Sequence, residues 1–180
     1  MKTGFLTMAL AVAWAGAVRT ASGALALSPA TVTRAVAMLS PTEANSVSGM
    51  VTFTRVATGV RIVADVTGLS PGLHGFQIHE FGNCGARDAS SSGGDFNPSR
   101  MQHGAPDSQF RQAGDLGNLF ADASGRAHYD RVDTIILLEG PNSVVGRAVT
   151  VHQRPDDLRS QPSGNVGPAV ACGVIGIASQ

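Results

Sequence analysis

Short runs of alternating apolar and polar residues, separated by turn-forming residues, dominate the first half of the chain. Apolar side chains recur at every second position in residues 47–55 and 60–66, and residues 31–39 are rich in Val, Thr and Ala. Ser-Pro, Thr-Gly and Ser-Pro-Gly sequences separate these runs, and residues 73–80 form a fourth. A period of two places one face of each strand in a core, so the pattern predicts antiparallel strands joined by turns.

The second half of the chain adds strands and two long segments without any period. Strands are predicted at residues 126–132, 134–138, 148–152 and 171–178, whereas residues 81–118 and 153–169 carry Gly, Ser, Asn, Asp or Pro throughout. A long structureless segment is uncommon in a compact domain and is usually functional. We therefore predict an all-β sandwich or barrel of about eight short strands, with two long loops that carry the function.

Composition narrows the class of protein. Hydrophobic residues make up 43% of the 180 residues and charged residues 14%, which excludes intrinsic disorder and a long solvent-exposed helix. Thirteen basic residues balance thirteen acidic ones, and the sequence has no basic patch that would bind nucleic acid. The length predicts a single domain.

The N-terminal segment predicts export. Lys2 precedes an uncharged stretch at residues 5–17, and small residues suited to signal peptidase lie at positions 15–17 and 21–23. A retained membrane anchor is the alternative, but the stretch is shorter than the ~20 residues that span a bilayer, and Arg19 follows it. We therefore expect residues 1–23 to be a signal peptide. Residues 30–180 would then form a secreted or periplasmic domain with no membrane attachment.

The chain has two cysteines, Cys84 and Cys172. Export to an oxidising compartment favours a disulfide between them over two buried free thiols. The positions are 88 residues apart (172 − 84). A chain-entropy model assigns a closed loop of this length roughly 4–5 kcal/mol of stabilisation.

Histidine and aspartate side chains gather where the predicted strands meet the loops. His79 lies where the first loop begins, His103 and Asp115 lie within that loop, and His152 lies where the second loop begins. Imidazole nitrogen suits zinc and copper, and carboxylates complete the charge of such sites. The arrangement therefore predicts a metal site organised by the two loops.

Five sequence motifs resemble those of the copper/zinc superoxide dismutase family. They are GLHGFQIHEFG at residues 72–82, DFNP at 95–98, HGAP at 103–106, GDLGN at 114–118 and ACGVIGIA at 171–178. The resemblance covers residues 30–180. It implies an eight-stranded Greek-key barrel of the immunoglobulin-like sandwich class, commonly a homodimer, that converts superoxide to oxygen and hydrogen peroxide.

The resemblance also implies a set of metal ligands. The family holds copper by four histidines and zinc by three histidines and an aspartate, with one histidine shared. Four positions keep the expected side chain: His79 and His152 for copper, and His103 and Asp115 for zinc. Four positions depart from the family: Gln77 replaces a copper histidine, Asp95 the shared histidine, Gln112 a zinc histidine, and Ala169 the arginine that guides superoxide.

These replacements change the chemistry of the site. Glutamine offers only a neutral amide oxygen, a poor ligand for copper or zinc. Asp95 cannot form an imidazolate bridge, although its carboxylate can ligate one metal or lie between two. The alanine removes a steering charge. We therefore expect loosely held copper, and weak or absent zinc at His103, Asp115 and Asp95.

The family's residues that support the metal ligands are partly retained in this chain. The resemblance gives Asp156 the role of linking a copper histidine to a zinc histidine, and a turn cap is its local alternative. His74 resembles a residue that ties the loops together through hydrogen bonds. The resemblance also implies the disulfide between Cys84 and Cys172.

Three functions follow from these observations. The first is an exported binding, scavenging or decoy protein with the dismutase fold but without normal catalysis, a pseudoenzyme, which the four replacements favour. The second is an active dismutase that uses His79, His152 and Asp95 as a two-histidine, one-carboxylate set. The third is a protein that stores or delivers copper without turnover. The resemblance implies copper and zinc as cofactors and a second copy of the chain as partner, with superoxide as substrate if the protein is active.

Overall fold

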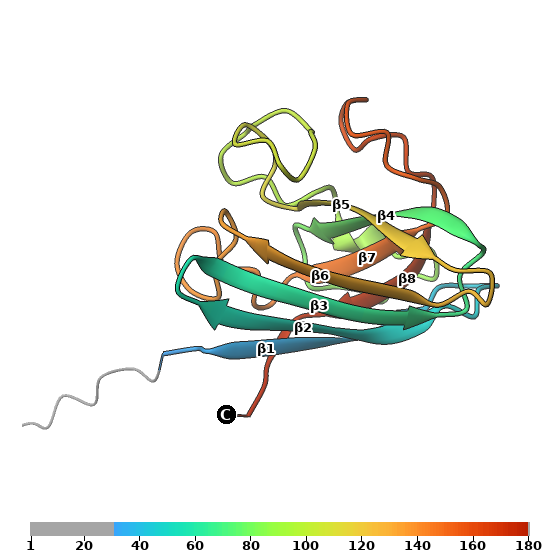
Figure 1. Ribbon diagram of the computed structural model, residues 1–180, viewed down its shortest axis with the longest axis horizontal. Helices are drawn as coiled ribbons and strands as arrows, with labels where there is room; N and C mark the ends of the chain where they lie inside the picture. The colour runs from blue at the N-terminus through green and yellow to red at the C-terminus, as the bar shows by residue number, and fades with distance from the viewer. Residues whose placement is uncertain (1–30, 180) are drawn as a thin grey trace, which may run out of the picture. The chain divides into compact units, whose positions relative to one another are not determined.

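The computed structural model describes residues 31–179, which fold into a closed antiparallel β-barrel of eight strands followed by a short ninth strand (Figure 1). The predicted signal peptide at residues 1–23 lies outside the described residues. The strands are β1 (Arg34–Pro41), β2 (Ser48–Val56), β3 (Gly59–Thr67), β4 (Gly72–His79), β5 (Asp115–Ala121), β6 (Ala127–Asp133), β7 (Ala148–His152), β8 (Ala169–Val174) and β9 (Gly176–Ile177).

The order of the strands is that of a Greek key. Neighbours around the barrel follow the order β2-β3-β6-β5-β4-β7-β8-β1, and pairing of β1 with β2 closes it. Strands β3 and β4 are consecutive in the chain but are separated in the sheet by β6 and β5. The prediction of an all-β, eight-stranded Greek-key barrel is therefore confirmed.

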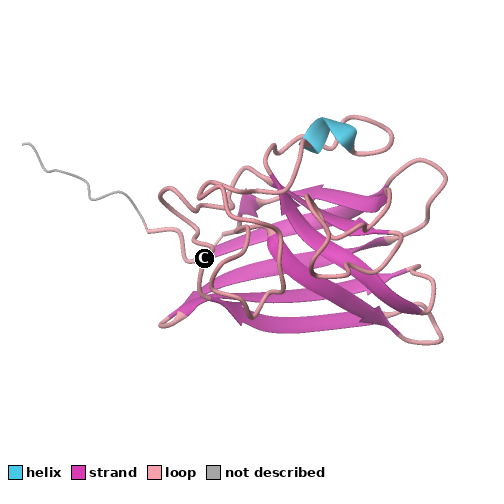
Figure 2. Ribbon diagram, turned by 90° about the horizontal axis from the view of Figure 1, so that it is seen from above, coloured by secondary structure: helices cyan, strands magenta, loops and turns pink. Residues whose placement is uncertain are grey.

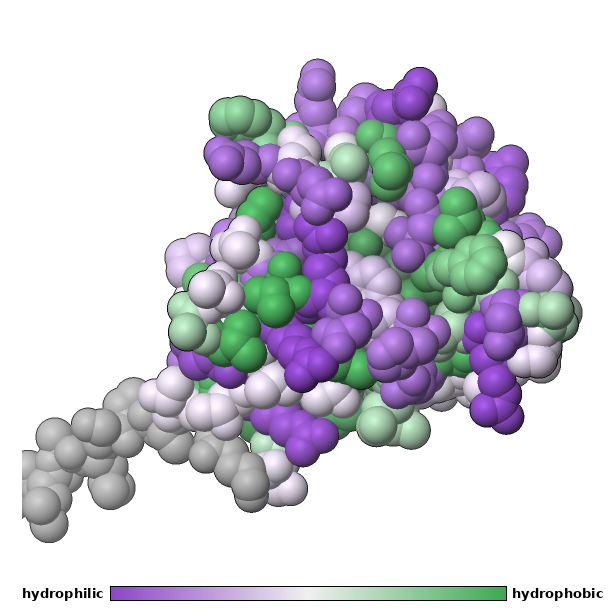
Figure 3. All heavy atoms as spheres, in the orientation of Figure 1, coloured by the Kyte–Doolittle hydropathy of each residue, from purple (hydrophilic) through white to green (hydrophobic). Residues whose placement is uncertain are grey.

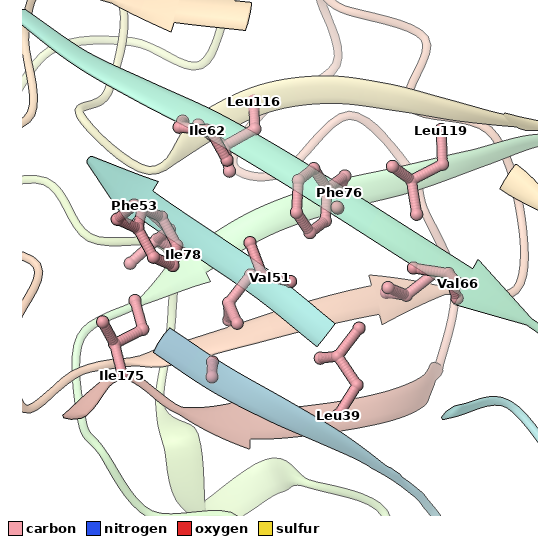
Figure 4. Close-up of a cluster of buried hydrophobic side chains, with 14 of the residues drawn as sticks. Leu39, Val51, Phe53, Ile62, Val66, Phe76, Ile78, Leu116, Leu119 and Ile175 are labelled. Atoms are coloured by element: carbon pink, nitrogen blue, oxygen red, sulfur yellow. The ribbon is translucent and has the colours of Figure 1, made fainter. Parts of the chain in front are cut away.

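The core fills the inside of the barrel, as the alternation predicts. Strand β3 buries every second residue, from Val60 to Val66, and Phe53 of the paired strand β2 is fully buried beside it. Figure 4 shows these apolar side chains converging from several strands of the barrel. Burial of this surface supplies the main stabilising free energy of the domain.

Two predictions about strands are wrong: β5 is missing from the predicted strands, and the strand predicted at residues 134–138 does not form. The first long loop ends at Asp115, where β5 begins, and not at residue 118. Residues 134–138 are not a strand, because Asp133 Oδ1 accepts hydrogen bonds from the amides of Ile135 and Ile136 and turns the chain. Ile136 is nevertheless fully buried, so the apolar pattern there reports burial and not a strand.

Within residues 31–179 the loops are irregular apart from one 3₁₀ turn, η1 (Ser90–Ser92), which is drawn in cyan in Figure 2. Cys84 of the first loop forms a disulfide with Cys172 of β8, as predicted, with Cα atoms 5.8 Å apart. Hydrophobic and hydrophilic side chains intermingle on the face shown in Figure 3. Within residues 31–179, no helix has the length and apolar character needed to cross a membrane.

Candidate metal centre

Strands β4 and β7 present the first site residues on the outer face of the barrel. Ile78 points into the core, so the alternation of β4 turns Gln77 and His79 the other way. Strand β7 pairs with β4, with Thr150 opposite Gln77, and ends at His152. The long loops cover this outer face, because Gln77 is 0% exposed and His79 only 9%.

The imidazole of His152 has both of its nitrogens engaged. Nδ1 lies 2.9 Å from the carbonyl oxygen of Gly167, and a carbonyl can only accept, so Nδ1 carries the proton. Burial lowers the pKa of His152 and keeps the ring neutral. Nε2 is then an acceptor 3.1 Å from the hydroxyl of Thr150, whose single hydrogen it shares with the carbonyl oxygen of Gln77, 3.3 Å from that hydroxyl. The nitrogen of His152 that would face a metal therefore has a hydrogen-bonding partner inside the protein.

The imidazole of His79 keeps a free lone pair. Its Nδ1 donates to the carbonyl oxygen of Gly93 at 2.9 Å. Burial, helped by the nearby His152, lowers the pKa of His79 to about 4, so the ring is neutral at pH 7. Its Nε2 is buried and has no hydrogen-bond partner among residues 31–179. The imidazole rings of His79 and His152 stack with their centroids 5.6 Å apart.

His103 is held between two carboxylates. Its Nδ1 donates to Asp115 Oδ1 and its Nε2 to Asp156 Oδ1, both at 2.8 Å, and all three side chains are 0% exposed. Burial by itself lowers the pKa of His103, but the hydrogen bonds and charges of the two aspartates outweigh it and raise the pKa to about 10. His103 is therefore an imidazolium at neutral pH.

Asp95 lies between the two halves of the centre. Its Oδ1 is 3.7 Å from His79 Nε2, and its Oδ2 is 4.0 Å from His103 Nδ1. Burial, followed by the negative charge of Asp115, raises the pKa of Asp95 to about 7. Asp95, His103 and Asp115 each offer a ligand atom, and these atoms lie within 4.8 Å of one another.

Three glutamine side chains join the second loop to the metal centre through hydrogen bonds. We call these side chains, Gln77, Gln112 and Gln161, the amide clamp. Gln77 Nε2 donates to the carbonyl of Ser163 at 3.2 Å, and Gln112 Nε2 donates to the carbonyl of Pro162 at 3.1 Å. Gln161 accepts from the amide of His103 at 2.8 Å and donates to its carbonyl at 3.0 Å. Two replaced ligand positions thus hold the loop through backbone carbonyls.

Asp156 joins the two long loops, and His74 joins the end of β7 to the turn before β4. Asp156 Oδ1 accepts from His103 and also from the amide of Leu158 at 2.7 Å, so the turn cap is present together with the half of the predicted link that involves the zinc histidine. Its Oδ2 has no hydrogen-bond partner within the described chain, so no bond reaches Gln77 from it. His74 lies between the carbonyl of His152, at 2.8 Å, and that of Ser70, at 2.9 Å.

An open cleft of about 580 Å³ leads to the floor formed by Gln77, His79, Asp95 and His152. Arg154 lines the same cleft, and its Nη2 donates to Asn165 Oδ1 at 3.0 Å. The sequence analysis missed this residue, although it follows His152 by two positions. A guanidinium therefore remains in the cleft despite Ala169.

Comparison with known proteins identifies the family. The copper/zinc superoxide dismutase family matches residues 47–175. The chain belongs to the copper/zinc superoxide dismutase family. A solved structure of the clock protein EA4 is 43% identical, with a TM-score of 0.75, and the match covers 82% of this chain and 97% of that one.

The side chains at the family's copper position do not fit copper. Of the two histidines present, only His79 has a free nitrogen lone pair, and Gln77 offers a neutral oxygen. Copper in this family is held by several imidazoles at once, a set that the side chains at this position do not provide.

The zinc side fits a metal better than the copper side. Asp95 Oδ2 is buried and has no hydrogen-bond partner in the described part of the chain, and it faces His103 Nδ1. One imidazole and two carboxylates therefore converge there. Bound zinc would serve as a structural ion that ties the loops together, and it would have to displace the proton on His103 Nδ1.

Proposed function

We propose that this protein is an exported member of the copper/zinc superoxide dismutase family with a degraded copper site and little or no dismutase activity. It would act as a binding, scavenging or decoy protein built on the dismutase scaffold. The proposal combines the family assignment with four side-chain replacements: Gln77, Asp95, Gln112 and Ala169.

One observation carries the proposal: the copper side of the centre is occupied by hydrogen bonds within the protein. The hydroxyl of Thr150 lies 3.1 Å from His152 Nε2, and Gln77 Nε2 donates to the second loop. Dismutation requires a metal that cycles between two oxidation states in a fixed coordination sphere. A single free imidazole, that of His79, does not provide one.

The similarity of this chain to the clock protein EA4 also supports the proposal. Its name describes it as a clock protein, and it is 43% identical to this chain over the matched region. The scaffold therefore suits roles besides dismutation.

An active dismutase with an altered site is the second candidate. Asp95 supports it, because its carboxylate lies 3.7 Å from His79 and 4.0 Å from His103, between the two halves of the centre. A carboxylate in that position could connect a metal on each side.

Metal analysis and a dismutase assay on one purified sample separate the candidates. We expect little activity after loading with copper and zinc. The combined substitution Gln77→His, Asp95→His and Gln112→His should restore metal binding and raise activity, and Ala169→Arg should raise it further, less so at high salt. Near-diffusion-limited turnover by the natural protein, or a triple variant that binds both metals and stays inert, would overturn the proposal.

Export rests on the N-terminal segment, and the disulfide fits it, because disulfides persist in oxidising compartments. We propose a secreted or periplasmic location. Detection of the mature chain, without residues 1–23, in the periplasm or culture medium would test it.

A homodimer is the partner we propose. Phe81 is 54% exposed, Val174 45% and Ile177 64%, and Val174 lies beside Gly82, the residue after Phe81. Exposed apolar side chains on neighbouring segments, here residues 81–82 and Val174, are typical of an interface. Sedimentation of the mature protein would decide between monomer and dimer.

A further inference from the structure

The zinc side of the centre differs in donor chemistry from a site of three histidines and one aspartate. Here the converging ligand atoms belong to Asp95, His103 and Asp115, one nitrogen and two carboxylates. Gln112 occupies the remaining position, and its buried Oε1 has no hydrogen-bond partner within residues 31–179. The donors on this side are therefore mainly oxygen.

Asp95 gives the strongest sign that this cluster is a site and not a chance grouping of acidic residues. Its side chain is only 4% exposed, and Oδ2 lacks any hydrogen-bond partner in the described chain. Leaving a buried carboxylate oxygen unpaired is costly. That oxygen lies 4.0 Å from His103 Nδ1, a separation that a cation between the two atoms would accommodate.

Hydrogen bonds and packing hold the other two ligands, Asp115 and His103, in place. Asp115 Oδ2 accepts hydrogen bonds from the amides of Gly104 and Gln112, both at 3.0 Å, which leaves Oδ1 directed at His103. Gly164 packs against the far side of the imidazole, because a Cβ there would come within 2.6 Å of His103 Nε2. Nδ1 therefore faces Asp95 and Asp115 without freedom to turn.

We propose that Asp95, His103 and Asp115 bind one divalent cation, with Gln112 Oε1 as a weaker fourth ligand, at a mononuclear site whose preference has moved from zinc toward manganese. Carboxylate and amide oxygens suit harder ions such as Mn²⁺, and loss of imidazoles weakens zinc more than manganese. The inference rests on the proposed function in one respect: it takes the copper side to be lost.

Equilibrium binding tests the site without any activity measurement. Metal-free protein is titrated with MnCl₂, free Mn²⁺ is followed by electron paramagnetic resonance, and ZnCl₂ binding is measured by calorimetry. We expect one Mn²⁺ per chain, with Asp95→Asn weakening it at least tenfold. Asp107→Asn is the matched control, since this carboxylate is 87% exposed on the same loop, and it should change affinity less than twofold.

Two further variants locate the ion and test its selectivity. Gln112→His should tighten zinc at least tenfold and manganese less than threefold, and this result stands even if Asp95→Asn fails to fold. His79→Ala should leave Mn²⁺ affinity within threefold.

Three outcomes would overturn the proposal. One is no Mn²⁺ binding, and another is an Asp95→Asn protein with unchanged affinity. The third is loss of the ion in His79→Ala, which would place it on the copper side. A dismutase-active natural protein would refute the proposed function and leave these binding results to be judged separately.

Discussion

His103 keeps its proton to a higher pH in the folded protein than in the unfolded chain. The metal-free protein should therefore lose stability as the pH rises from neutrality toward 10. The pKa of His103 is raised from 6.5 to about 10 by Asp115 and Asp156. A raised pKa stabilises the fold fully below pH 6.5, and this stabilisation is lost as the pH rises through 10. A shift of this size corresponds to a contribution on the order of 4–5 kcal/mol, lost by at most ~1.4 kcal/mol per pH unit.

Other groups of the centre titrate at lower pH and largely oppose one another. The lowered pKa of His79, about 4, makes the unfolded chain take up its proton first, so stability from His79 is lost as the pH falls from 6.5. The raised pKa of Asp95, about 7, acts with the opposite sign, because the folded protein keeps that proton up to pH 7. Above pH 7.5 the effect of His103 should dominate.

Urea unfolding between pH 7.5 and 9.5, in the presence of EDTA, measures the effect. The natural protein should lose about 2–3 kcal/mol over this range. Asp156→Asn should be less stable at pH 7.5 and show a flatter slope, because one carboxylate that raises the pKa of His103 is gone. His128→Gln is the control, since the ion pair of His128 with Asp65 is exposed on both sides. A free energy of unfolding that is constant within ~0.5 kcal/mol over this range would refute the reasoning.

Three further outcomes are expected. Replacing Gln77 and Gln112 together by Ala should cost roughly 0.5–1.5 kcal/mol per lost bond and speed proteolysis at residues 158–166, and unchanged proteolysis would contradict the amide clamp. Replacing Cys84 and Cys172 together by Ser should lower the free energy of unfolding by up to ~4–5 kcal/mol, and an unchanged urea midpoint would contradict that role. Phe81→Glu should convert a dimer to a monomer in sedimentation, and a natural protein that is already monomeric would remove the basis for the proposed interface.

The fold could be predicted wherever alternation and burial agree. Strand β3 is an example, because each apolar residue from Val60 to Val66 points into the core. Strand β5 could not be predicted, since it opens on Asp115, a fully buried carboxylate held by hydrogen bonds, and continues through Gly117 with positive φ. A strand that serves the site carries residues that local patterns assign to loops.

The site could be predicted as a set of residues but not as a set of bonds. The sequence identifies His152 as a ligand position, yet nothing in it shows that the hydroxyl of Thr150, two residues earlier on β7, lies 3.1 Å from Nε2, because that depends on the side-chain rotamers in the folded site. Arg154 was missed for a similar reason: its place in the cleft follows from the path of the second loop. Pairwise geometry of this kind is set by tertiary structure.

Loss of metal ligands need not loosen the loops, because this chain holds them in other ways. The disulfide joins the first loop to β8, and His103 joins the first loop to the second through Asp156. The amide clamp adds bonds to consecutive carbonyls, those of Pro162 and Ser163. Glutamine can reach these carbonyls from a ligand position while leaving its own oxygen buried, and that oxygen is the group a cation would satisfy. The glutamine replacements therefore keep the second loop bound to the centre, which is compatible with the loss of the copper site and with the binding of a harder ion that we propose.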